Sequence, residues 1–142
     1  MVNINKIINK FEMLDGFLAI LRDLSKKNIE KYLVDPVLIG STRYYLQVAI
    51  ECCLDVASHV ISSERYRAPR DYADTFTILE EEKLIPSELA QRLRQMAKFR
   101  NRLVHLYGEI DDKTVYRIIG EDLNDIEMFK AIILKHFAIK GQ

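Results

Sequence analysis

Apolar residues near the start of the chain recur every three or four positions, which is the spacing of one face of an α-helix. The pattern predicts an amphipathic helix over residues 3–25, with an apolar face made of Ile4, Ile7, Ile8, Phe11, Leu14, Leu18 and Leu21. The other side of this helix is polar, so we expect it to lie in solvent.

A second and more apolar helix is predicted from Asp35-Pro36 to about Ser63. Asp is a favoured N-cap residue, and Pro is favoured in the first turn of a helix. From Val37 to Ile61 apolar residues occur on nearly every side. We therefore expect several neighbouring helices, or a second subunit, to bury this helix.

Shorter helical segments follow, separated by proline-containing turns. Residues 64–70 interrupt the apolar pattern, and a third helix is predicted over residues 71–82. A fourth is predicted over residues 86–105, and Gly108 just beyond it is expected to terminate it. The inward-facing residues of the fourth helix are predicted to be Leu89, Leu93, Met96 and Leu103.

The last third of the chain predicts a short helix from Asp111 through Ile119, a break at Gly120, and a final helix to about Ala138. No segment alternates apolar and polar residues as a half-buried strand does, and no internal repeat is visible. The pattern predicts an all-α protein. A length of 142 residues fits one domain, residues 1–142.

Composition and charge restrict the class of protein. The chain is 49% hydrophobic and 30% charged, with five Gly and three Pro, which is typical of an ordered globular protein. The chain has 21 Lys and Arg residues and 21 Asp and Glu residues, so it lacks the excess of positive charge that is typical of a protein that coats nucleic acid. Any nucleic-acid site must therefore be local.

The N-terminal residues lack the continuous apolar core of a signal peptide, and no run of about 18 apolar residues is present to span a membrane. The two cysteines, Cys52 and Cys53, are neighbours on one predicted helix, and their side chains diverge by about 100°. This geometry disfavours a disulfide between them and leaves no thiolate metal site. We expect a cytoplasmic protein without a membrane segment.

The fourth helix is the most uneven segment in charge, because no Asp or Glu occurs from Leu89 through Gly108. Its cations are Arg92, Arg94, Lys98, Arg100 and Arg102. One interpretation is a solvated face, with cations favoured toward the negative end of the helix dipole. The other is a phosphate-binding patch.

Residues 99–107, FRNRLVHLY, place an Arg, an Asn, a His and a Tyr at one helix end. An Arg followed by a polar residue, with His five positions after the Arg, resembles the signature of HEPN domains. The pattern Arg-x4-His-x-Tyr, matched by Arg100, His105 and Tyr107, is similar to that of the HepT-like toxins. The resemblance covers about residues 10–135 and includes the stretches AIECCLDVASHVIS, PRDYADTF and AKFRNRLVHLYGEID.

This resemblance implies an antiparallel bundle of about five helices and a homodimer that pairs two motifs across a cleft. It also implies a toxin that cleaves RNA without metal or cofactor, with tRNA among the family's substrates. The family's partner is a nucleotidyltransferase antitoxin, MntA, which attaches AMP to the Tyr that corresponds to Tyr107. Negative charge added there would repel an RNA phosphate from His105 and Arg100.

The chemistry of these residue types is consistent with that activity. Imidazole can take a proton from a ribose 2′-hydroxyl near neutral pH, whereas guanidinium stays charged and can stabilise the phosphorane. We expect His105 to be the base or acid, Arg100 the phosphate clamp, and a 2′,3′-cyclic phosphate the product. The reaction uses one base and one acid, so we hypothesise that two His105 residues of a dimer share the roles.

Helical geometry qualifies the roles around the motif. Arg100 and His105 differ by about 140° in direction, whereas Asn101 and His105 share a face. We expect Asn101 to hydrogen-bond or position His105. Arg102 competes with Arg100 for the clamp role, and the resemblance favours Arg100. We expect Arg102 and Lys98 to contact RNA.

Glu51, Asp55 and His59 follow one another at four-residue steps along the second helix. Buried charges need partners, so we expect Glu51 or Asp55 to order Arg100 or another cation of the fourth helix. A metal site on this stripe is the alternative, and nothing else in the chain supports it. We expect structural roles for His59 and His136.

Two features stay open from the residues alone. Residues 64–70 are either a plain charged loop or an RNA clamp made of Arg65, Arg67 and Arg70 around Tyr66. Tyr107 either packs over the helix end or exposes its hydroxyl for binding or modification.

Three functions compete. The first is a ribonuclease toxin controlled by an adjacent nucleotidyltransferase. The second is a non-catalytic nucleotide-binding or docking subunit of such an enzyme, with Arg100 and His105 as phosphate ligands. The third is an oligomerisation module in which the motif is incidental. A neighbouring nucleotidyltransferase gene would separate the first two from the third.

Overall fold

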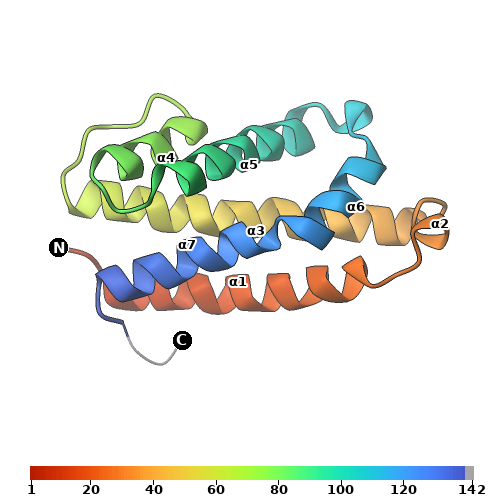
Figure 1. Ribbon diagram of the computed structural model, residues 1–142, viewed down its shortest axis with the longest axis horizontal. Coiled ribbons are helices and arrows are strands. Elements are labelled where there is room, and N and C mark those ends of the chain that lie inside the picture. The colour runs from red at the N-terminus through yellow and green to blue at the C-terminus, as the bar shows by residue number, and fades with distance from the viewer. Residues whose placement is uncertain (140–142) are drawn as a thin grey trace.

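The computed structural model describes residues 1–139, which form seven α-helices and one 3-10 turn and contain no strand (Figure 1). The elements are α1 (Ile4–Ser25), α2 (Ile29–Tyr32), α3 (Pro36–Ser63), α4 (Tyr72–Glu81), α5 (Ser87–His105), η1 (Tyr107–Glu109), α6 (Asp112–Glu121) and α7 (Leu123–His136). The predicted all-α class is confirmed.

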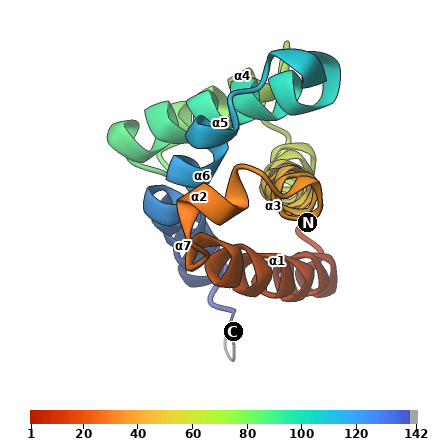
Figure 2. The ribbon, with the colours of Figure 1, turned by 90° about the vertical axis from the view of Figure 1, so that its right-hand side faces the viewer.

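The four long helices α1, α3, α5 and α7 run antiparallel in succession (Figure 1), and an end-on view shows them grouped around a shared core (Figure 2). The short α4 packs against α5, and α6 contacts α1, α3 and α7. This arrangement is the expected antiparallel bundle, and it brings the end of α5 to the same end of the molecule as α2 and α6 (Figure 1).

Helix starts follow the predicted chemistry. Asp35 caps α3 by accepting the backbone N–H groups of Val37 and Leu38, and Pro36 occupies the first turn. Asp71 caps α4 in the same way. The apolar face of α1 is buried as predicted, except that Ile8 is only partly buried and Ile4 is exposed.

Helix α3 is the central element, in contact with α1, α4, α5, α6 and α7. Its most apolar window has a mean hydropathy of 1.2, which by length and composition would suffice to cross a membrane. However, 56% of that window is buried within the bundle, as in the core helix of a water-soluble protein.

Cys52 and Cys53 lie in this core with free thiols, and burial raises the pKa of Cys52 to about 11.

The predicted glycine terminators are wrong. Helix α5 ends at His105 with Leu106 as its C-cap, and Gly108 lies within the 3-10 turn. Gly120 lies inside α6, and the break falls at Asp122, which both ends α6 and precedes α7. Sequence reasoning also missed the single-turn helix α2.

Non-glycine residues with left-handed backbone conformations end three other helices, and at α7 this residue is Ala138, with φ of 54°. Arg65 after α3 and Lys83 after α4 adopt left-handed backbone conformations, with φ of 60° and 62°. The residue following each donates its N–H to the carbonyl five residues earlier, at 3.0 and 2.9 Å. This is the Schellman arrangement, which glycine adopts without steric cost.

Candidate functional site

The last turns of α5 border an open hollow of about 450 Å³ on the surface of the bundle. Asn101 and His105 line it from α5, so the two residues share a face as predicted. The opposite wall comes from α3, from the segment before α4 and from the start of α4, and consists of Ser58, Pro69, Arg70, Asp71, Tyr72 and Thr75.

Arg100 is held from α3 rather than left free. Its Nε and Nη2 donate to one carboxylate oxygen of Glu51 at 2.9 and 2.6 Å, and its side chain is 15% exposed. The guanidinium carbon lies 4.9 Å from the ring centroid of Tyr72, a cation–π contact. The predicted pairing of a carboxylate on α3 with Arg100 is confirmed for Glu51.

Asp55, the other predicted carboxylate, instead pairs with Lys10 of α1 at 3.0 Å. It still borders a second hollow of about 250 Å³ together with Glu51, Leu54, Tyr72 and Arg100. Tyr72 lines both hollows, so its ring is a shared wall between the Arg100 side and the His105 side.

The expected hydrogen bond between Asn101 and His105 is absent from residues 1–139. The Asn101 Oδ1 accepts a hydrogen bond from Arg100 Nη1 at 3.3 Å, which turns the amide toward its neighbour. A common helix face therefore places the two side chains in one hollow without joining them, and His105 is exposed there.

The remaining cations of α5 point to different sides. Lys98 borders a hollow of about 370 Å³ that shares Arg70 and Asp71 with the hollow at His105. Arg102 is directed elsewhere, because its guanidinium carbon lies 5.7 Å from the ring centroid of Phe99. Phe99 lines a separate cavity with residues of α6 and α7, so Arg100 rather than Arg102 lies beside the His105 hollow.

Tyr107 begins the 3-10 turn after α5, and its side chain is 59% exposed. Beneath it lies Arg43 of α3, which is buried and whose guanidinium carbon is 4.5 Å from the Tyr107 ring centroid. Arg43 donates to the carbonyls of Tyr107 and Ile110 at 2.8 and 3.3 Å and to the carboxylate of Asp112 at 2.8 Å. The turn is thus anchored while the ring stays accessible.

Sequence reasoning missed Arg43. The available signal was its isolation, because it is the one Lys or Arg between Lys31 and Arg65 in the sequence and lies within the most apolar helix. A lone cation in such a helix needs buried partners.

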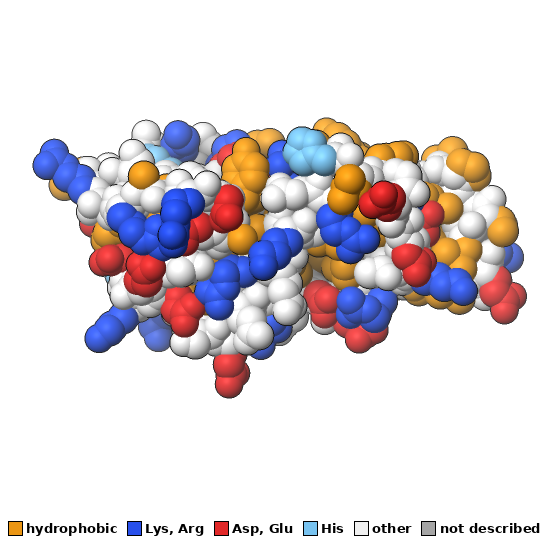
Figure 3. All heavy atoms as spheres, turned by 90° about the horizontal axis from the view of Figure 1, so that it is seen from above, with side chains coloured by type: hydrophobic (Ala, Val, Ile, Leu, Met, Phe, Trp, Pro, Cys, Tyr) orange, Lys and Arg blue, Asp and Glu red, His pale blue; other side chains and the backbone are white. Residues whose placement is uncertain are grey.

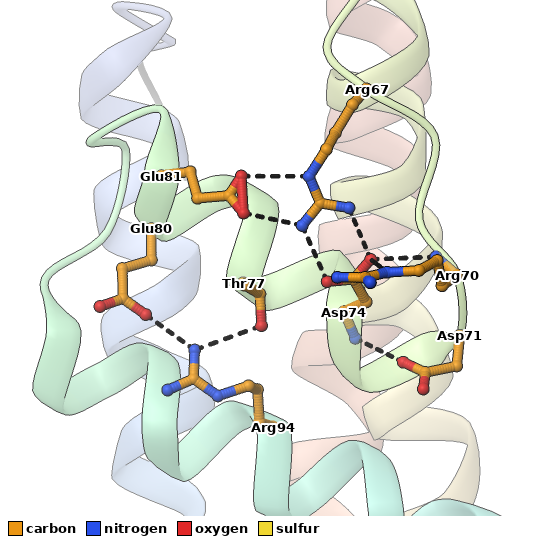
Figure 4. A network of polar contacts seen from close by, with 8 residues as sticks. All are labelled: Arg67, Arg70, Asp71, Asp74, Thr77, Glu80, Glu81 and Arg94. Atoms are coloured by element: carbon orange, nitrogen blue, oxygen red, sulfur yellow. Dashed lines mark hydrogen bonds and ion pairs between the residues drawn. The ribbon is translucent and has the colours of Figure 1, made fainter.

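The segment before α4 is fixed by ion pairs (Figure 4). Arg67 donates to both carboxylate oxygens of Asp74 at 2.7 and 2.9 Å and also pairs with Glu81. These hydrogen bonds and the N–H of Arg70 hold the pKa of Asp74 far below its usual range. Arg67 is therefore structural. Arg70 also pairs with Asp74, at 3.5 Å from its Nε, but its side chain remains 83% exposed.

The remaining histidines have structural surroundings. His59 Nε2 accepts the backbone N–H of Asn3 at 2.9 Å, and desolvation lowers the pKa of His59. His136 packs against Phe137 at the end of α7. Within residues 1–139 no three His, Cys, Asp or Glu side chains converge as metal ligands would, so the stripe on α3 does not form such a cluster.

Residues 14–133 match the sequence model of a family described as "Ribonuclease HepT-like". The mRNA nuclease HepT of Shewanella oneidensis is 29% identical over 130 residues, covering 92% of this chain and 94% of that protein. The tRNA nuclease HepT of Aphanizomenon flos-aquae is 24% identical over 131 residues, covering 91% and 89%.

Solved structures give the same picture. A toxin–antitoxin complex with AMP-PNP superposes with a TM-score of 0.87 at 27% identity, covering 92% of this chain and 98% of that one. The tri-AMPylated HEPN toxin of Shewanella oneidensis, in complex with the MNT antitoxin, gives a TM-score of 0.85 at 28% identity, covering 92% and 97%.

Proposed function

The chain belongs to the HepT-like ribonuclease family, and we propose that it is the toxin of a toxin–antitoxin pair, an endoribonuclease that cuts RNA without a metal ion. The observation that carries this proposal is the open hollow beside α5, where His105 and Asn101 face solvent next to the Glu51-held Arg100. An exposed imidazole beside a fixed guanidinium suits a phosphodiester substrate.

In the proposed reaction, His105 takes the proton of a ribose 2′-hydroxyl, and the 2′-oxygen attacks the adjacent phosphorus. The bond from phosphorus to the 5′-oxygen breaks, and the leaving oxygen takes a proton from a second imidazolium. The products are a 2′,3′-cyclic phosphate and a 5′-hydroxyl. We assign the second proton to His105 of the partner subunit, because one chain supplies one motif histidine.

A homodimer would complete this site. The exposed hydrophobic residues Val104, Leu106 and Tyr107 flank His105, and Tyr44 is exposed on α3 next to Arg43. Figure 3 shows hydrophobic side chains gathered toward the end of the molecule where α2 lies. Apolar surface next to the motif is what a pairing of two motifs would bury.

Control by a nucleotidyltransferase antitoxin of the MntA type would act through Tyr107. Its exposed ring, held over Arg43, favours an accessible hydroxyl over a packing role. The relative from Shewanella oneidensis was solved in a tri-AMPylated form with its antitoxin. AMP on Tyr107 would place negative charge two residues from His105 and repel an RNA phosphate.

One observation favours the second candidate function, a non-catalytic docking or nucleotide-binding subunit. The charge of Arg100 is already compensated by Glu51, so this guanidinium attracts a phosphate less strongly than a free one would. A subunit that only docks needs no unpaired cation at this position.

Expression without an antitoxin separates the two functions. We expect the wild-type chain to arrest growth and to leave RNA fragments with 2′,3′-cyclic phosphate ends, also when a chelator is present during cleavage in vitro. His105→Ala should abolish both effects, whereas His136→Ala, which changes an exposed histidine on α7, should retain them. Equal behaviour of wild type and His105→Ala would sink the ribonuclease proposal.

A further inference from the structure

The hollow beside His105 has an aromatic wall that the proposed reaction does not use. Tyr72, the first residue of α4, is 48% exposed, and Pro69 lies three residues before it on the same wall. Flat, partly exposed rings of this kind are the surfaces on which proteins stack the bases of single-stranded RNA.

The ring of Tyr72 is held in place from behind. The Arg100 guanidinium packs against it, and Glu51 in turn fixes that guanidinium. A base stacked on Tyr72 would extend this stack, and it would lie in the hollow that His105 also lines. The base-binding surface and the reacting imidazole are thus parts of one site.

Asn101 offers a polar contact to such a base. Its amide oxygen accepts from Arg100 Nη1, which leaves the two N–H donors of the amide for other partners. An amide donor in this hollow suits a carbonyl or ring nitrogen on the edge of a nucleobase.

The adjoining hollow provides cations for the neighbouring phosphates. It shares Arg70 with the His105 hollow and is also lined by Lys98, which has no ion pair within residues 1–139. Lys98 and His105 are seven residues apart on α5, about 10 Å along the helix axis. A strand lying along α5 would therefore meet cations beyond the reacting group.

The anions along this path are already engaged (Figure 4). Asp71 accepts the backbone N–H of Asp74 at 2.7 Å, and Glu80 pairs with Arg94 at 2.7 Å. Asp74 pairs closely with Arg67 and more loosely, at 3.5 Å, with Arg70, whose side chain stays 83% exposed. The Arg67–Asp74 pair and the backbone N–H of Arg70, which donates to Asp74 at 3.0 Å, hold the segment that carries Pro69 and Arg70, so little ordering entropy is lost when a strand binds.

We infer that these two hollows form a binding track for single-stranded RNA, with one nucleobase stacked on Tyr72 and Pro69 and adjacent phosphates on Arg70 and Lys98. The inference rests on the proposed ribonuclease function and adds the site's mode of substrate recognition. It implies a substrate whose bases next to the scissile phosphate are unpaired.

The test is a base-removal scan. Fluorescent single-stranded RNAs of mixed sequence, each with one abasic nucleotide, are titrated against full-length His105→Ala protein, which does not cut them. We expect one abasic position to weaken binding about tenfold, as loss of one stacked base does. This loss of affinity at the abasic position should persist when Tyr72→Phe is added to the protein, because phenylalanine keeps the ring. It should vanish when Tyr72→Leu is added, because leucine has no ring on which a base can stack.

A purely structural Tyr72 would behave differently. If Tyr72 only supports Arg100, Tyr72→Leu weakens intact and abasic RNA by the same factor, and the inference is overturned. The inference is also overturned if the protein binds none of the RNAs, or if no abasic position lowers the binding affinity. Since binding is scored without cleavage, these outcomes are distinct from failure of the ribonuclease test.

The phosphate half of the track has its own measurement. Arg70→Ala and Lys98→Ala should each weaken binding and lower the salt dependence of the affinity by about one unit of slope, whatever the RNA sequence. Lys135→Ala, an exposed lysine of α7, should change neither quantity. Unchanged slopes in both track variants would remove these residues from the proposal.

Discussion

One carboxylate oxygen of Glu51 accepts two hydrogen bonds from Arg100 and a third from Gln47 at 3.2 Å. Arg100 could adopt many rotamers on an exposed helix, and this pairing selects one that faces Tyr72. The consequence is a guanidinium whose direction is fixed before substrate arrives, while the nearby carboxylate reduces its attraction for a phosphate.

Glu51→Gln tests that balance. The amide keeps the size of the side chain but loses the negative charge, so Arg100 becomes less ordered and its positive charge is no longer compensated. We expect kcat for RNA cleavage to fall about tenfold, because misorientation near the reacting group is costly. The KM should stay equal or decrease.

The matched control is Asp55→Asn, one helical turn further along α3, where the carboxylate pairs with Lys10 instead. Asp55→Asn should leave both kcat and KM for RNA cleavage unchanged. A Glu51→Gln protein with wild-type kcat would show that Glu51 has no part in positioning Arg100.

Single residues also mark the limits of sequence reasoning. The Glu51–Arg100 pair was predictable because a carboxylate within an apolar helix needs a cation, although the choice between Glu51 and Asp55 depended on where Lys10 of α1 lies. Arg43 was not predictable as an anchor, since its carbonyl partners lie 64 and 67 residues away.

At the scale of helices, periodicity and capping chemistry located most elements. Apolar spacing predicted α1, α3 and α5 within one or two residues, and Asp35 and Asp71 cap helices as expected. Helix ends were less predictable. Tertiary packing and Schellman bonds end α3 and α4 at Arg65 and Lys83, where no glycine signals a stop.

Lys83→Gly should therefore stabilise the protein. Lysine has a left-handed φ of 62° there, and glycine relieves that conformation by about 1 kcal/mol. Urea unfolding followed by circular dichroism should show a higher midpoint with an unchanged slope. Lys83→Ala keeps the steric conflict of a Cβ atom, so it should bring no gain; an equal gain would contradict the explanation.

At the scale of the whole molecule, the bundle places the motif at one end, beside exposed apolar side chains. The antiparallel order of the helices follows from their lengths and short connections, which the sequence displays. The periodicity of apolar residues does not show which surface of the bundle pairs with a second copy, because that depends on the shape of the surface. The sequence therefore predicted a dimer only through the family resemblance.

Val104→Glu tests the proposed dimer. A carboxylate in a closely packed apolar contact has no partner, so the variant should sediment as a monomer and lose RNA cleavage while keeping its helical circular dichroism. Met13→Glu, which alters an exposed apolar residue on α1, should sediment and cut like the wild type. A monomeric Val104→Glu protein that still cleaves RNA would refute the shared-histidine mechanism.

The Arg43 anchor has a consequence for synthesis of the chain. Arg43 leaves the ribosome long before Tyr107, Ile110 and Asp112, the three residues it holds. Until they emerge and fold back onto α3, the turn after His105 has no support, and a nascent or truncated chain lacks a formed site. For a proposed enzyme that attacks cellular RNA, including RNA in translation, this order of assembly postpones activity until the residues that follow His105 have been made and have folded onto α3.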